Sequence, residues 1–201
     1  MITLRPITAA ERHAYHRFRH SIYANSRVRG FIDPSSKEDR DIYDEKAIHL
    51  GWFPGGELKA CVRLVEPTGS AAPLPMCGIL DDYNRALVEA FLSIRAQQGH
   101  RLVEASRLCL APEHRSLRNA MHFVMAIVQH AHEQGIDHGI FDMHRQHRDF
   151  YLRMGFLDLE GSNCFSSDQI GPTVLMTYDH AKLMANRRVQ GNGDRSLPFA
   201  A

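Results

Sequence analysis

Apolar residues recur along the chain at two spacings, and these spacings predict alternating strands and helices. Apolar runs bounded by turn residues predict strands at residues 2–5, 47–53, 58–65, 102–110, 136–143, 156–159 and 174–178. Apolar residues three and four apart predict helices at residues 9–24, 80–98, 117–134 and 148–154. A hairpin followed by alternating helices and strands indicates an α/β (α+β) fold of three layers, with helices on both faces of a mixed sheet.

The ends of these helices carry the expected sequence signals. Thr8 and Glu11 form a capping box, in which each side chain bonds the backbone of the other residue. Ser116 is a typical N-cap, and Gly135 is a typical residue after the last turn. The predicted apolar faces are formed by Tyr15, Phe18, Ile22, Leu87, Phe91, Ile94, Met121, Val124, Met125 and Val128.

The composition is that of an ordinary globular protein and changes this picture little. The chain has 201 residues, of which 44% are hydrophobic and 23% are charged. We expect one domain over residues 1–186 and a flexible tail over 187–201, which has few side chains to bury. The net charge of +1 gives no field that would favour a nucleic-acid partner.

The cysteines and the start of the chain predict a cytoplasmic protein. The four cysteines form no C-x-x-C pair, and Cys61 and Cys109 lie in apolar runs, as buried free thiols do in a reducing compartment. The first residues show no secretory signal. No apolar stretch approaches the roughly 18 residues of a membrane-spanning helix.

The histidines do not predict a metal site. His13, His16 and His20 follow one another along the first predicted helix, where we expect them at the surface. His144 and His147 lack the neighbouring glutamate of a metalloprotease helix. We therefore expect neither a metal nor a tightly bound cofactor.

The segment Phe150-Tyr-Leu-Arg-Met-Gly-Phe156 predicts a short helix, a glycine able to adopt a positive φ, and the start of a strand. In the second half of a mixed domain it resembles the late helix–strand signature of GNAT-type N-acyltransferases. That resemblance implies a sheet splayed in its middle, with the pantetheine arm of an acyl thioester lying in the splay.

Charged residues interrupt the apolar runs at several positions. An isolated charge in an apolar strand costs several kcal/mol, so these groups need partners. Glu104 and Arg107 would face opposite sides of an ideal strand unless a bulge intervenes. The arrangement that we expect sets Arg19, Arg63 and Arg107 against Asp41, Asp44 and Glu104.

These residues, in this order, resemble the acyl-homoserine-lactone (autoinducer) synthases and the related N-acyl amino acid synthases. The pieces are Arg19-x-x-x-Tyr23, Asp41-x-x-Asp44, Arg63-Leu64 and Glu104-x-Ser-Arg107, and the resemblance covers about residues 10–160. The autoinducer synthases carry a tryptophan in the loop after the first helix, where this chain has Arg-Gly-Phe at 29–31. The stretch 44–75 is more similar to the N-acyl amino acid synthases.

The resemblance implies an N-acyltransferase that moves a medium- or long-chain acyl group from a thioester to the amine of an amino acid. Glu104 is the candidate base, with Arg107 beside it, and a base is required because an ammonium group cannot attack. Backbone amides of Leu108, Cys109 and Leu110 are candidates for stabilising the oxyanion. Arg19, Tyr23, Asp41, Asp44 and Arg63 are expected to bind the acceptor or to build the scaffold around it.

The donor is expected to be an acyl carrier protein or acyl-CoA. CoA-dependent GNAT enzymes have a glycine-rich loop before their third helix, whereas residues 115–120 contain no glycine. Arginine suits phosphate, and carrier proteins are acidic. The candidate carrier or phosphopantetheine contacts are Arg115, Arg118, Asn119, Arg148 and Tyr151.

Three alternatives remain open. An autoinducer synthase would make acyl-homoserine lactone from S-adenosylmethionine. A conventional acetyltransferase would use acetyl-CoA. A non-catalytic module would bind an acyl carrier or a lipid without turnover, which the pairing of Glu104 with Arg107 argues against.

Overall fold

The computed structural model describes residues 2–26, 32–33, 35–68, 73–167 and 171–191. Residues 29–31, which differ from the autoinducer synthases, and the last ten residues of the predicted tail, 192–201, lie outside these ranges.

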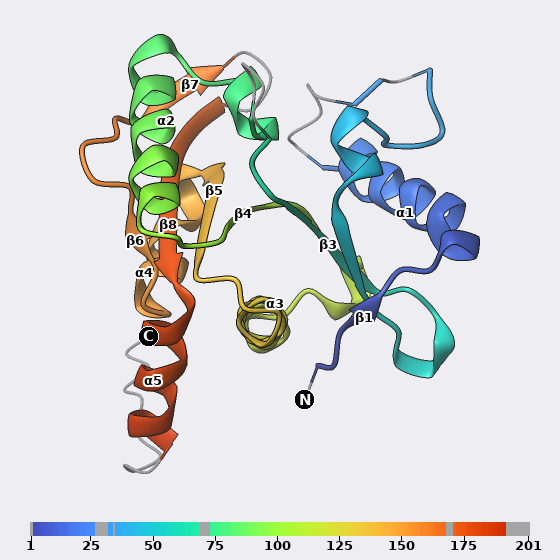
Figure 1. Cartoon of the computed structure of the whole chain (residues 1–201). Helices are drawn as coiled ribbons and strands as arrows, with labels where there is room; N and C mark the ends of the chain where they lie inside the picture. Colours follow the sequence, from blue (N-terminus) through green and yellow to red (C-terminus); the bar gives the residue numbers. More distant parts are fainter. Residues whose placement is uncertain (1, 27–31, 34, 69–72, 168–170, 192–201) are drawn as a thin grey trace.

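Helices and strands alternate along the chain much as the apolar spacing predicts (Figure 1). The helices are α1 (Arg12–Ala24), α2 (Asp82–Gln97), α3 (Leu117–Glu133), α4 (Arg148–Arg153) and α5 (His180–Gly191). The strands are β1 (Arg5–Pro6), β2 (Ile48–Trp52), β3 (Ala60–Val65), β4 (Leu102–Leu110), β5 (His138–His144), β6 (Leu157–Asp158), β7 (Phe165–Ser167) and β8 (Gly171–Asp179).

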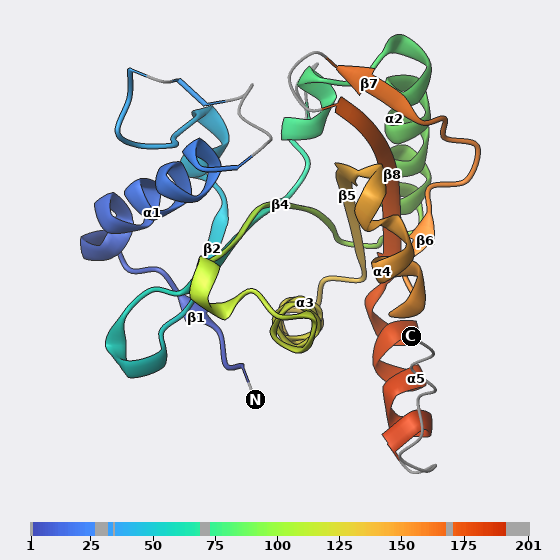
Figure 2. The same cartoon turned by 180° about the vertical axis from the view of Figure 1, so that it is seen from behind.

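The strands form a mixed sheet that opens in its middle (Figures 1 and 2). Its order is β1-β2-β3-β4-β5-β8-β6, and β7 also pairs with β8. Of the described pairs, only β4 and β5 are parallel, and they pair only at Leu102–Glu104 with 138–140. Beyond Glu104, β4 is paired only with β3, and β5 is paired only with β8. The predicted splayed sheet is therefore confirmed, and Glu104 lies at the point where it opens.

Helices cover both faces of the sheet, which confirms the three predicted layers. On one face, Tyr15 of α1 packs beside β3, and Val88 of α2 packs against Val65 and Leu175. On the other face, Phe123 of α3 packs in a cluster of β2, β3 and β4 residues. A neighbouring stripe of the same helix, which includes Val124 and Val128, packs with residues of β5 and β8. This helix therefore spans the opening.

Several expectations about the elements need correction. The first strand, predicted at residues 2–5, is β1 at Arg5–Pro6, so it begins where the prediction ends. Ile94, predicted to face the core, is 53% exposed, whereas Val88 is buried. The contact of α2 with the core therefore lies nearer the N-terminus of the helix than predicted. The strand β7 and the helix α5 are not predicted by apolar spacing. The predicted tail begins inside α5, which continues to Gly191.

Gly139 permits a close approach between β5 and β8. It pairs with Tyr178, and a Cβ atom at Gly139 would lie 2.1 Å from two ring atoms of that tyrosine. The Tyr178 ring is thereby placed 4.7 Å, between ring centres, from Phe156 and 6.0 Å from Phe141. A glycine here fixes the aromatic cluster beneath α4.

Candidate active site

A β-bulge in β4 lies beside the opening of the sheet. The register between β3 and β4 shifts between Cys61 and Arg63, so Arg107 and Leu108 together lie opposite a single residue of β3. Arg107 has a φ of 54°, in the left-handed region that favours glycine. In a regular strand Arg107 and Glu104 would face opposite sides of the sheet. The bulge brings both side chains to the same side.

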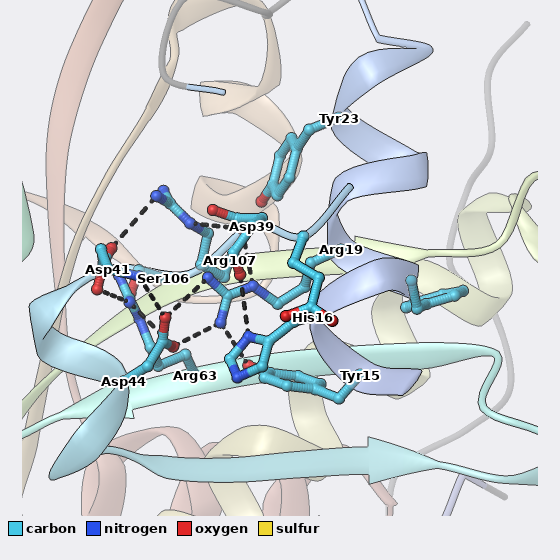
Figure 3. Close-up of polar contacts among 12 residues, drawn as sticks. Tyr15, His16, Arg19, Tyr23, Asp39, Asp41, Asp44, Arg63, Ser106 and Arg107 are labelled. Carbon is cyan, nitrogen blue, oxygen red and sulfur yellow. Dashed lines mark hydrogen bonds and ion pairs between the residues drawn. The ribbon is translucent and has the colours of Figure 1, made fainter. Parts of the chain in front are cut away.

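Buried arginines from α1 and β3 converge on the segment that precedes β2 (Figure 3). Arg19 donates from Nε to Asp39 Oδ2 at 2.8 Å and from Nη1 to Asp44 Oδ1 at 2.6 Å. Arg63 donates from Nη1 to Asp41 Oδ1 at 2.6 Å and to Asp44 Oδ1 at 3.2 Å. The expected pairing of Arg19 and Arg63 with Asp41 and Asp44 is thus present.

The third acid of this network is Asp39, and the prediction that Glu104 takes this place is wrong. Arg107 Nε lies 2.9 Å from Asp39 Oδ2, and its Nη2 lies 3.4 Å from Asp41 Oδ2. Asp39 is fixed by its backbone, which donates to the carbonyl of His16 at 3.1 Å. Sequence reasoning missed Asp39, although an acid two residues before Asp41 was the available signal.

Buried histidine rings of α1 and β2 contact the segment that carries the acids of this network. His49 Nδ1 lies 2.9 Å from Tyr15 Oη, and its Nε2 lies 2.9 Å from the carbonyl of Asp44. His16 Nδ1 lies 2.9 Å from the carbonyl of Asp39, so the expectation of a surface position for His16 is wrong. Burial lowers the pKa of His49 to about 4, and the ring is therefore neutral near pH 7.

Solvent reaches this balanced set of charges at one side only. The side chains of Arg19 and Arg63 are 0% exposed, whereas those of Arg107 and Asp41 are 17% and 29% exposed. Burial alone would raise the pKa of Asp44, but hydrogen bonds and charge from Arg19 and Arg63 outweigh it and hold the pKa well below its usual range. Arg107 and Asp41 are the members that a ligand can contact.

Glu104 lies apart from the network and is fully buried. Its Oε2 accepts a hydrogen bond from the amide of Met76 at 2.9 Å, and its Oε1 has no partner among the described residues. Burial, followed by the charge of Asp142, raises its pKa to about 8, against the lowering effects of the Met76 amide, Arg63 and Arg107. Such a carboxyl gains and loses its proton near neutral pH, as a general base requires.

Two further titratable groups lie near Glu104. Burial is the main cause of the raised pKa values of Tyr43 and Cys77, and the charge of Glu104 raises both further. Cys77 belongs to the turn Pro75–Gly78 that also supplies the Met76 amide, and Tyr43 belongs to the turn Ile42–Glu45 that carries Asp44.

The bulge also presents backbone to the side of the sheet that α1 covers. The hydroxyl of Tyr23 lies 3.5 Å from the carbonyl oxygen of Leu108, and the Arg107 guanidinium lies 5.9 Å from the centre of the Tyr23 ring. Leu108 is 37% exposed, whereas Cys109 is buried. Of the three candidate oxyanion donors, Leu108 lies in the bulge itself, and Leu110 ends the strand.

The candidate donor-binding residues of α3 lie at its N-terminus. Ser116 caps the helix by accepting from the amide of Asn119 at 3.1 Å, which confirms the predicted cap. The Asn119 side chain donates to the carbonyl of His114 at 3.0 Å, and Arg115 Nε donates to the carbonyl of Leu110 at 3.0 Å. The side chain of Arg118 is exposed.

The candidate donor-binding residues of α4 lie in two different settings. Arg148 forms a two-pronged ion pair with Asp158, so its charge is already balanced. Tyr151 is partly buried and packs against the core, with its ring centre 5.0 Å from Phe141 and 5.3 Å from Phe156, and burial raises its pKa to about 12. A hollow of about 460 Å³ beside α4 is lined by His144, Arg145, Gln146, Arg148, Asp149 and Pro172.

The part of the chain that the structure describes contains no group of three or more His, Cys, Asp or Glu side chains placed to hold a metal ion. Within the same part, no helix has the length and apolar character needed to cross a bilayer.

Several solved structures share this fold. FeeM, an N-acyl amino acid synthase from uncultured soil microbes, is 20% identical, with 92% of this chain and 93% of that chain covered and a TM-score of 0.67. BjaI, a CoA-dependent acyl-homoserine lactone synthase solved with SAM and isopentyl-CoA, is 19% identical, with 98% and 96% covered and a TM-score of 0.68. A putative N-acetyltransferase from Lactobacillus plantarum is 16% identical, with 88% and 98% covered and a TM-score of 0.58.

The family comparison is more specific than the fold. No curated protein matches the chain. The family model of the N-acyl amino acid synthase FeeM matches residues 14–179, a range that contains Arg19, Asp39, Glu104 and Arg107. The resemblance seen in the sequence is therefore confirmed, and the protein is an acyltransferase. This chain belongs to the FeeM family of N-acyl amino acid synthases.

Proposed function

We propose that this protein transfers a medium- or long-chain acyl group from a carrier-bound thioester to the amine of a free amino acid. The observation that carries the proposal is the position of Glu104. It lies at the opening of the sheet with one oxygen unpartnered, beside a network that offers a partly exposed arginine. Residues 1–186 would act as one catalytic unit.

In this proposal Glu104 is the general base. The acceptor arrives as an ammonium, and Glu104 Oε1, directly or through one water, removes a proton so that the nitrogen can attack the thioester carbonyl. The backbone amide of Leu108, aided by Cys109 and Leu110, stabilises the oxyanion that forms. A bulge supports this role because it leaves one residue without a partner across the strands.

The arginines divide into two roles. Arg107 would bind the carboxylate of the acceptor, because it is the member of the three that solvent reaches. Arg19 and Arg63, which are fully buried, would serve as scaffold together with Asp44. Tyr23 and Asp41 line the same side and would contact the acceptor.

The donor would be an acyl carrier protein or acyl-CoA, bound as a co-substrate. Arg115, Arg118 and Asn119 lie where a helix N-terminus favours phosphate. The hollow beside α4 adds Arg145 and His144, and a cationic Arg145 suits an acidic carrier protein. Arg148 and Tyr151 would act there chiefly by supporting the shape of this surface.

The proposal is tested by mass spectrometry of lipid extracts from cells that express the protein or its Glu104→Ala variant at equal levels. A new N-acyl amino acid that disappears with the variant supports the proposal and identifies both acyl length and acceptor. An acyl-homoserine lactone would instead show that the acceptor is S-adenosylmethionine. An N-acylated amine without a carboxylate would overturn the role given to Arg107.

A further inference from the structure

Two buried polar atoms of opposite character lack a hydrogen-bond partner at the opening of the sheet, within the described part of the chain. Glu104 Oε1 is an acceptor and Arg63 Nη2 is a donor, and both residues are 0% exposed. Glu104 lies opposite Val65, and Arg63 lies opposite Ser106, so the two side chains leave the sheet on the same face. A buried group without a partner costs about 1–3 kcal/mol. A ligand with both a cationic donor and an anionic acceptor would satisfy both.

Asp142 lies across the opening from Glu104. Glu104 pairs with Ile140, the last register position between β4 and β5, and Asp142 follows two residues later on the same face. The Asp142 carboxylate is partly buried and accepts from its own backbone amide. The charge of Asp142 raises the pKa of Glu104, and the charge of Arg107 lowers the pKa of both carboxyl groups. A carboxylate at this place is suited to bind a cation.

We propose that Asp142 binds the ammonium group of the acceptor and positions it against Glu104. This inference rests on the acyl transfer proposed above and adds the residue that holds the ammonium group of the amino acid. Its ammonium lies between Asp142 and Glu104, and its carboxylate faces Arg107 and the free N–H of Arg63. Asp142 is therefore a substrate-binding residue that sequence spacing did not single out.

The ammonium gives one proton to the Glu104 carboxylate while Asp142 keeps the nitrogen in place. The amine then forms a bond to the thioester carbonyl carbon, and the carbon–sulfur bond breaks. The nitrogen loses a second proton as the thiolate leaves, and that proton neutralises the thiolate. Glu104 then releases its proton to solvent, so the products are an amide, a thiol and one proton, and the Glu104 carboxylate is restored.

The test compares Asp142→Asn with the unmodified protein and with Asp82→Asn, a control in an exposed acid of α2. Thiol release is measured with decanoyl-CoA and with decanoyl carrier protein, first with a mixture of the standard amino acids and then with each active one. For Asp142→Asn we expect KM for the amino acid to rise about 10- to 100-fold with a smaller change in kcat. The pH midpoint of kcat/KM should also move to lower pH, because a like charge beside Glu104 is gone.

Asp142→Glu, which restores the charge, should recover part of the affinity, and this separates binding from a merely structural defect. An unchanged KM and pH midpoint in Asp142→Asn, with active unmodified protein, would overturn the role of Asp142 and leave the acyl transfer standing. No amine-dependent thiol release from the unmodified protein would overturn the acyl transfer itself, and the inference with it.

Discussion

Arg19 and Asp44 form a salt bridge of 2.6 Å between Nη1 and Oδ1 that is closed to solvent, with side chains 0% and 2% exposed. The pair joins α1 to the turn before β2. Removing one member of a buried pair leaves the other charge without compensation in a medium of low polarity.

Asp44→Asn should therefore destabilise the protein by about 3–5 kcal/mol, because both Arg19 and Arg63 lose a charged partner. The free energy of unfolding in urea measures this. Arg101 and Glu66 form a matched control pair, also 2.6 Å long but 47% and 49% exposed. Glu66→Gln should cost less than about 1 kcal/mol. Equal losses in the two variants would show that burial does not govern the network.

Substitution of Arg107 should separate the backbone strain from the function of the side chain. Its φ of 54° suits glycine, so Arg107→Gly should be more stable than Arg107→Ala by about 1 kcal/mol. Both variants should lose activity to the same extent, since both lack the guanidinium that contacts Asp39 and Asp41. Thermal unfolding and turnover of the two proteins provide the comparison. An alanine variant at least as stable as the glycine variant would argue against the bulge geometry.

Glu104 should make the protein less stable as pH rises. Its pKa in the folded protein is about 8, above the ordinary 4.5 of the unfolded chain, so folding favours the protonated form. The stabilising contribution is complete below pH 4.5 and is lost as pH rises through 8. Glu104→Gln lacks this ionisation, so its stability relative to the unmodified protein should increase between about pH 5 and pH 9. Parallel urea titrations of the two proteins across that range test the sign, and a constant difference would contradict the raised pKa.

Gly139→Ala should destabilise the protein by about 1–3 kcal/mol, because its methyl group meets the ring of Tyr178. Gly78→Ala is the matched control, since a Cβ there has no heavy atom within 4 Å, and its effect should stay within about 0.5 kcal/mol. Thermal unfolding of both variants measures the difference. If Gly139→Ala leaves the stability of the protein unchanged, β8 can move away from β5 without a cost in free energy.

Much of the fold follows from the sequence where one face of an element is apolar. The strand at Leu102–Leu110 has the predicted bounds, and α3 begins at the predicted cap. The helix α5 has weak apolar spacing, and Leu183 is its one buried apolar residue among those whose side chains are described, so periodicity gives little signal there. The strand β7 has three residues, too few for a pattern.

The contacts within the site are harder to predict than the fold. The charge of a residue and its place in a strand do not determine which side chain it contacts. Arg19, Arg63, Asp41 and Asp44 pair as expected, since buried charges need partners. The third acid depended on a bulge that turns Arg107 toward Asp39. His16 was expected at the surface because its burial comes from a segment 23 residues away that folds over α1.

Thiol release from a decanoyl thioester at pH 8 shows whether the protein transfers an acyl group directly to an amine with Glu104 as the base. The rate is measured for the purified protein and for Glu104→Gln, each with and without the amino acid that supports thiol release. We expect release only with the amino acid, one amide formed per thiol, and a rate about 10²- to 10⁴-fold lower in Glu104→Gln. Release without the amino acid would show that the acyl group is not passed directly to the amine, and an equal rate in Glu104→Gln would show that Glu104 is not the base.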